Sequence, residues 1–186
     1  MNIFIGCSSH EEIDDKYKSI TKGIVKELAK IPNLNLVLGT ANDNSGLMKC
    51  CYDEFKKNKK EVTGISLSIY KEFKYLEMNQ IIEVETTMDR TKEIYKSSDI
   101  LLFLPGGLGT YSEILSSLTE TVEKKDNKMI ILYNKDFFFT PIIQELHLLY
   151  KKGFITNNIN EYCKIESEID NILELIKKER EIIWKN

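Results

Sequence analysis

Residues 105–113 read Pro-Gly-Gly-Leu-Gly-Thr-Tyr-Ser-Glu and follow directly on an apolar run at residues 100–104. A helical pattern begins immediately afterwards, so the segment predicts a strand, a glycine turn and a helix start. Such a junction brings backbone N–H groups together at the positive end of a helix, where an anion such as a phosphate can sit without large side chains in the way. The sequence therefore predicts an anion-binding turn at this point.

Short apolar runs alternate with helical patterns along the rest of the chain. Strands are expected at residues 2–5, 34–38, 62–67, 81–84, 100–104, 129–133 and 162–165, and helices at 15–30, 46–58, 87–97, 110–124, 140–151 and 167–178. Regular alternation of this kind favours an α/β fold, a Rossmann-like doubly wound and mainly parallel sheet with helices on both faces. The length of 186 residues fits a single domain, residues 1–186.

Small and polar residues follow three of the expected strands. They are Gly6–Ser9 after the first strand, Gly39–Gly46 after the second, and the motif that begins at Pro105. Ligands of doubly wound sheets bind beyond the carboxyl ends of the strands. We therefore expect these three segments to form one crevice.

Composition argues against several classes of protein. The net charge is −3 with basic and acidic residues scattered along the chain, so no nucleic-acid partner is expected. The four cysteines contain no Cys-x-x-Cys pair and are interpreted as reduced thiols, and neither a metal nor a cofactor is predicted. The chain opens directly into a strand-like segment and has no apolar run of membrane-spanning length, which predicts a cytoplasmic protein without a membrane partner.

Two interpretations compete for Thr110 and Glu113. The spacing Thr-x-x-Glu is that of a capping box, in which both side chains satisfy free N–H groups at a helix start. A simple cap does not require three glycines in the four positions from Gly106 to Gly109, however. We therefore favour a ligand-binding role for Glu113.

The remaining polar candidates also have two interpretations. Arg90 either pairs with Glu93 on a helix surface or lies at the mouth of the crevice, facing a phosphate or a sugar. Ser8 and Ser9 either cap the following helix or contact a phosphate. Neither His10 nor His147 is predicted to act as a base.

Arg90 and the run Pro105–Glu113 together resemble the signature of the LOG family, the cytokinin-activating "Lonely guy" phosphoribohydrolases that are often mislabelled lysine decarboxylases. The resemblance extends over nearly the whole chain. Gly6-Cys7-Ser8-Ser9 is similar to the opening Gly-Ser-Ser turn of the family, and Gly46 opens a segment similar to its second glycine loop.

This resemblance implies hydrolysis of the N-glycosidic bond of a nucleoside 5′-monophosphate, AMP or N6-modified AMP, to a free base and ribose 5-phosphate. It implies that Arg90 and Glu113 are the catalytic pair. It further implies a homodimer or larger homo-oligomer and the following substrate contacts: Gly6, Ser8, Gly46, Glu72, Gly106, Gly107, Leu108, Gly109, Thr110 and Thr119.

The chain departs from the family pattern at three places. Thr91 stands where a lysine usually follows the arginine, Ser112 replaces a glutamate, and Gly39-Thr40-Ala41 replaces three glycines. These departures motivate a second hypothesis, a nucleotide or cofactor carrier or sensor that does not hydrolyse its ligand. A nucleoside deoxyribosyltransferase is a third, less favoured alternative.

Overall fold

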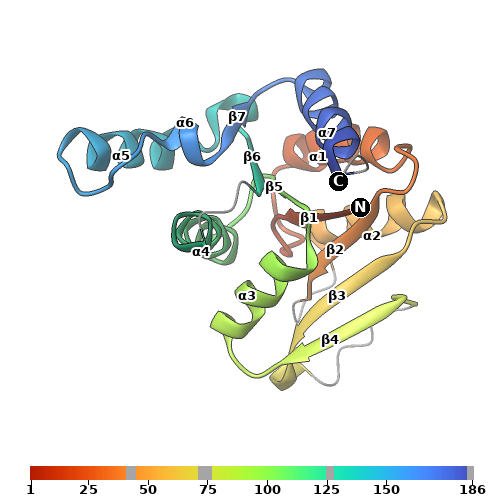
Figure 1. Ribbon diagram of the computed structural model, residues 1–186. Coiled ribbons are helices and arrows are strands. Elements are labelled where there is room, and N and C mark those ends of the chain that lie inside the picture. The colour runs from red at the N-terminus through yellow and green to blue at the C-terminus, as the bar shows by residue number, and fades with distance from the viewer. Residues whose placement is uncertain (41–44, 71–76, 125–127, 184–186) are drawn as a thin grey trace.

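A seven-stranded sheet forms the centre of the computed structural model, which describes residues 1–40, 45–70, 77–124 and 128–183 (Figure 1). Every ladder between these strands is parallel, and their order is β4-β3-β2-β1-β5-β6-β7. The strands are β1 Asn2–Gly6, β2 Asn35–Gly39, β3 Val62–Leu67, β4 Gln80–Val84, β5 Ile100–Phe103, β6 Met129–Tyr133 and β7 Lys164–Glu166. The predicted doubly wound α/β architecture is confirmed.

Side chains alternate between the two faces of the sheet because the period of a strand is two residues. In β1, Ile3 and Ile5 pack into one apolar layer while Phe4 packs into the other. The first layer includes residues of α1, α2 and α7, and the second includes residues of α3, α4, α5 and α6 (Figure 1). The helices are α1 Asp15–Leu28, α2 Gly46–Lys57, α3 Thr87–Ser97, α4 Leu108–Lys124, α5 Thr140–Lys151, α6 Ile159–Tyr162 and α7 Ile169–Ile183, with short 3-10 turns at Ser68–Tyr70 and Lys135–Phe137.

The sequence prediction differs from the structure mainly at element ends. Helix α4 starts at Leu108, two residues before the predicted start at Thr110. Helix α6 was not predicted, and Tyr162, expected to open the last strand, is its final residue. A capping box holds this short helix: Asn158 caps its first turn while the Glu161 side chain accepts from the Asn158 N–H. The capping box at Asn158 favours a helical turn where the apolar pattern had predicted a strand.

The order of the strands reverses at β1, which pairs with β2 on one side and with β5 on the other. Gly6 lies opposite Phe103 in the β1–β5 ladder, and a Cβ atom at Gly6 would come within 2.6 Å of the Phe103 ring. The Leu104 N–H donates to the Gly6 carbonyl at 2.9 Å, and the Ser8 N–H donates to the Pro105 carbonyl at 3.2 Å. The two loops after these strands therefore emerge side by side, at the position where doubly wound sheets bind ligands.

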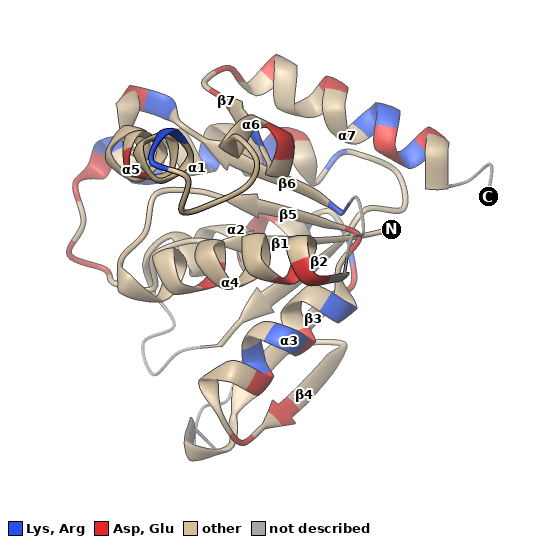
Figure 2. Ribbon diagram, turned by 60° about the vertical axis from the view of Figure 1, so that its left-hand side comes forward, with Lys and Arg blue, Asp and Glu red and all other residues tan. Residues whose placement is uncertain are grey.

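Basic and acidic residues stand beside one another on α3 and on α7 (Figure 2). This mixture agrees with the scattered charges seen in the sequence. Within the described ranges, no helix combines the length and the apolar character needed to cross a membrane.

Candidate functional site

The glycine turn between β5 and α4 leaves the start of α4 open. A Cβ atom at Gly106 would overlap the Thr110 side chain and come within 3.1 Å of the Ser8 nitrogen, so this glycine permits close packing. Cβ atoms at Gly107 and Gly109 would instead meet no heavy atom within 4 Å. The first N–H groups of a helix have no partner within the helix. Open space therefore lies beside unpaired donors at the positive end of α4.

Thr110 and Glu113 do not form the capping box considered from the sequence. Because α4 begins at Leu108, Thr110 is its third residue and cannot be its N-cap. The Glu113 carboxylate instead faces the Arg90 guanidinium, with Oε1 and Nη2 3.6 Å apart. Only 10% of the Glu113 side chain and 14% of the Arg90 side chain is exposed.

Arg90 reaches Glu113 from the first turn of α3. This helix is capped by Thr86, whose hydroxyl accepts from the Asp89 N–H at 3.1 Å. The Arg90 guanidinium lies against the backbone of Gly39 at the end of β2, where a Cβ atom would overlap it. Its Nε is buried and has no hydrogen-bond partner within the described part of the chain.

The alternative surface pairing of Arg90 is not adopted. Glu93 pairs with Lys96 on the same helix, at 3.5 Å, and accepts from the Ser97 hydroxyl. Arg90 points into the interior beside Glu113 instead.

Burial makes the Glu113 carboxyl group a weaker acid than an exposed glutamate. Desolvation raises its pKa to about 7, from an ordinary value of 4.5, while the charge of Arg90 lowers it. At neutral pH the group exchanges between its acid and its carboxylate form, which is typical of residues that take part in chemistry.

The loop after β1 closes the other side of the site. Ser8 and Ser9 do not cap α1, whose N-cap is Asp14. The Ser8 carbonyl instead accepts from the N–H groups of Leu47 at 3.0 Å and Met48 at 3.2 Å, in the first turn of α2. The Ser45 hydroxyl donates to the Ser9 carbonyl at 3.0 Å. The loop is thus fixed to α2 on one side and to the Pro105 turn on the other.

These segments enclose a cavity of about 310 Å³. Polar side chains of Ser8, Ser9, Arg90, Thr110 and Glu113 line it together with Gly107, Leu108 and Gly109. The structure thereby brings together most of the residues that sequence reasoning selected. His10, which was not predicted to act as a base, also lines this cavity.

The other predicted contacts lie around the cavity or outside it. Gly6 and Gly106 do not line the cavity; they permit the close packing of the loops after β1 and β5 that is described above. Gly46 opens α2 with a φ of +63°, and its neighbouring groove lies on the α1 side. Glu72 lies outside the described residues.

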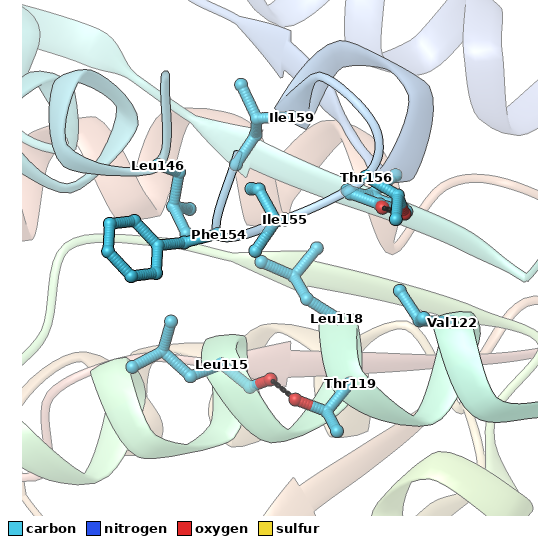
Figure 3. Close-up of a pocket in the computed structure, with 10 residues that line it drawn as sticks. Leu115, Leu118, Thr119, Val122, Leu146, Phe154, Ile155, Thr156 and Ile159 are labelled. Carbon is cyan, nitrogen blue, oxygen red and sulfur yellow. Dashed lines mark hydrogen bonds between the residues drawn. The ribbon is translucent and has the colours of Figure 1, made fainter. Parts of the chain in front are cut away.

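Thr119 lies apart from this cavity within one copy of the chain. It belongs to a second, apolar groove of about 450 Å³, between the outer face of α4 and residues 154–162 (Figure 3). Its hydroxyl donates to the Leu115 carbonyl at 2.9 Å, within its own helix (Figure 3). The structure therefore separates Thr119 from the residues with which the sequence grouped it.

Comparison with protein families gives a match at residues 48–176, more than half of the chain, to the family described as "Possible lysine decarboxylase". The chain belongs to this family. The matched segment includes Arg90 and the whole glycine turn with Glu113, whereas the loop after β1 lies before it.

Curated relatives of this family member carry the name cytokinin riboside 5′-monophosphate phosphoribohydrolase. LOG4 of Arabidopsis thaliana is 24% identical over 178 residues, covering 95% of this chain and 80% of that protein. The protein of Rhodococcoides fascians is 22% identical over 179 residues, covering 95% and 89%. LOG2 of Arabidopsis thaliana is 24% identical over 119 residues, so that the match spans 64% of this chain and about half, 51%, of the relative.

Solved structures share the fold. The molybdenum cofactor binding protein of Rippkaea orientalis superposes with a TM-score of 0.66 at 22% identity, covering 95% of this chain and 94% of the other. The molybdenum cofactor carrier protein of Chlamydomonas reinhardtii gives a TM-score of 0.67 at 13% identity, covering 96% of each chain. At such identities the likeness concerns the architecture of the sheet and its helices.

We predict that Glu113→Gln changes the pH dependence of stability. The raised pKa means that the folded protein holds this proton more tightly than the unfolded chain does. The contribution of this carboxyl group to the stability of the fold is therefore fully present below pH 4.5, and it is lost as the pH rises through about 7. The free energy of unfolding of the glutamine variant, relative to wild type, should increase by about 2–3 kcal/mol between pH 4 and pH 8.

Urea unfolding at several pH values measures this difference. Glu61→Gln, at an exposed position before β3, is the matched control and should show no comparable increase. A difference between the Glu113 variant and wild type that stays constant with pH would contradict the prediction.

Proposed function

We propose that the protein hydrolyses the N-glycosidic bond of a nucleoside 5′-monophosphate, AMP or N6-modified AMP, releasing the base and ribose 5-phosphate. One observation carries the proposal: a single cavity joins the open start of α4 to a buried carboxyl group beside an arginine. Family membership and the names of the curated relatives support it.

The start of α4 suits the phosphate of such a substrate. Unpaired N–H groups and the helix dipole favour an anion there, and Gly107 and Gly109 add no side chain that would occupy its space. A phosphate at this position directs the attached ribose along α4. Glu113 lies one to two turns further along the same helix and lines the same cavity.

Glu113 suits the reaction at the sugar. Cleavage of the bond between C1′ and the base builds positive charge on the ribose ring, and an ionised carboxylate stabilises that charge more than it stabilises the neutral sugar. Arg90 lowers the pKa of Glu113 and so favours the ionised form, against the effect of burial. We assign these two residues as the catalytic pair. The Arg90 guanidinium lies beside Gly39 at the end of β2, where it can also bind a sugar or phosphate oxygen.

A binding protein without hydrolysis is the second candidate, because the position next to Arg90 supplies no second cation. Thr91, which stands where the family usually has lysine, is buried, and its hydroxyl donates to the Thr87 carbonyl at 3.1 Å. Lys92 instead lines a separate groove that it shares with Glu93 of α3 and Glu120 of α4. Arg90 is the single lysine or arginine in the described lining of the cavity, which suits a protein that retains its ligand without turnover.

Release of free base from AMP, N6-modified AMP and other nucleoside monophosphates tests the enzymatic proposal directly. Wild-type protein should release base, and Glu113→Gln should slow release at least about 100-fold, since it removes the charge that stabilises the sugar cation. Glu61→Gln should retain full activity. Chromatography of the free base provides the measurement.

Other outcomes of this assay identify other functions. Tight binding of a monophosphate without any turnover would favour the carrier or sensor. Exchange of bases between unphosphorylated nucleosides would favour a deoxyribosyltransferase. Absence of base release from every monophosphate would reject the proposed reaction.

We predict that Gly39→Ala impairs base release although residue 39 carries no functional group. A methyl group there would overlap the Arg90 guanidinium and force it away from Glu113. The rate constant kcat should fall by about tenfold or more, because misplaced groups lose their transition-state interactions. Gly23→Ala in α1 is the matched control: its methyl group would make an ordinary contact of 3.6 Å with Ile169 and leave activity unchanged.

We further propose that a second copy of the chain packs on the apolar groove of Figure 3. Leu115 and Val122 leave 46% and 45% of their surfaces exposed along α4, and Phe154 leaves 78% exposed opposite them. Helix α4 carries this groove on one side and Glu113 on another, so a copy docked there would lie close to the cavity. This arrangement would also bring Thr119 to a subunit interface.

Sedimentation velocity tests the proposed dimer. Wild-type protein should sediment as a dimer at micromolar concentration, and Leu115→Lys should shift it to the monomer because a charge would be buried in the apolar contact. Ile182→Lys, at an exposed position of α7, should leave the dimer intact. A wild-type protein that is monomeric throughout this range would refute the proposal.

A further inference from the structure

We propose that His10 is the acid that protonates the departing base, an assignment that rests on the proposed hydrolysis of a nucleoside monophosphate. His10 lines the cavity that contains Arg90 and Glu113, yet its side chain is exposed. It therefore stands at the solvent-facing side of the cavity, whereas the Glu113 carboxyl group is buried.

The backbone fixes the position of His10. Its N–H donates to the Ser8 hydroxyl at 3.2 Å. Its carbonyl lies against Gly46, where a Cβ atom would overlap it, so the residue is held between its own loop and the first turn of α2. Within the described ranges, the imidazole ring itself makes no hydrogen bond or ion pair with the protein.

The chemistry of the cavity singles out this ring. A purine leaves readily only when a ring nitrogen gains a proton, and a positioned side chain can donate it. The serine and threonine hydroxyls of the cavity are too weakly acidic, and the guanidinium of Arg90 does not deprotonate in proteins. Glu113 is assigned to the sugar cation in its ionised form. Cys7 also lines the cavity, but it belongs to the buried apolar layer of the sheet. Among the described side chains of the lining, this leaves the imidazole of His10, whose ring nitrogens can carry a proton and pass it to a base.

The proposed step conserves atoms and charge. The bond between C1′ and N9 breaks, and its electron pair goes to the base while N7 takes the proton from the His10 imidazolium. The oxygen of a water molecule bonds to C1′, and the water proton passes to the Glu113 carboxylate and then to solvent. His10 regains a proton from solvent, so the net reaction is nucleoside monophosphate plus water to base plus ribose 5-phosphate.

A pair of substrates that differ in their need for a proton tests this role. AMP requires protonation at N7, whereas 7-methyl-AMP carries a positive charge there and its base leaves without a proton. With His10→Gln and His10→Ala, kcat for AMP should fall by about 100-fold. The value for 7-methyl-AMP, corrected for uncatalysed release, should change by less than about threefold.

The outcomes separate the proposals. Unchanged kcat for AMP in both variants would overturn the role of His10. An equal loss of kcat with both substrates, or a change in KM alone, would also overturn it, because either result indicates a role in binding only. Ser9→Ala, next to His10 on the same loop, should reduce kcat for the two substrates to a similar degree if it reduces it at all. Failure of the wild type to release base from either substrate would instead reject the hydrolase function itself.

Discussion

The parallel pairing of β1 with β5 is the constraint on which the site depends. These two strands meet where the strand order reverses, so their following loops leave the sheet together, joined by the Ser8–Pro105 hydrogen bond. The close approach of Gly6 to Phe103 lets the ladder continue to the last residue of β1. Without this pairing, the open start of α4 and the β1 loop would not share a cavity.

The Arg90–Glu113 pair shows how the fold sets the properties of the site. At 3.6 Å in a poorly solvated location, the arginine offsets only part of the desolvation that the carboxyl group suffers, and the pKa stays raised. The buried Nε of Arg90 has no hydrogen-bond partner in the described part of the chain, and an unsatisfied buried donor also destabilises the folded state. Such features are costly for the folded protein and are commonly found where a ligand completes the set of interactions.

The sequence was sufficient for the sheet and for most of the cavity, and the reasons are local. Apolar runs marked β1 to β3, β5 and β6, and the glycine turn placed Gly107 and Glu113 beside the end of a strand. Features that depend on three-dimensional packing could not be predicted from the sequence. The start of α4 at Leu108, and the direction in which Thr119 faces, follow from helix phase and from neighbouring chain segments. His10 gave no signal, because its position depends on the contact of its backbone with α2.

The contact between the His10 carbonyl and Gly46 restricts which substitutions each of these two positions tolerates. Gly46 has a left-handed backbone, and the His10 carbonyl occupies the space that a Cβ atom would need, so almost any other residue would displace the β1 loop and the first turn of α2 together. Position 10, by contrast, contributes to that contact through its backbone alone. A substitution at position 10 therefore changes the chemistry of the cavity at little structural cost, whereas a substitution of Gly46 disturbs the backbone that anchors the loop.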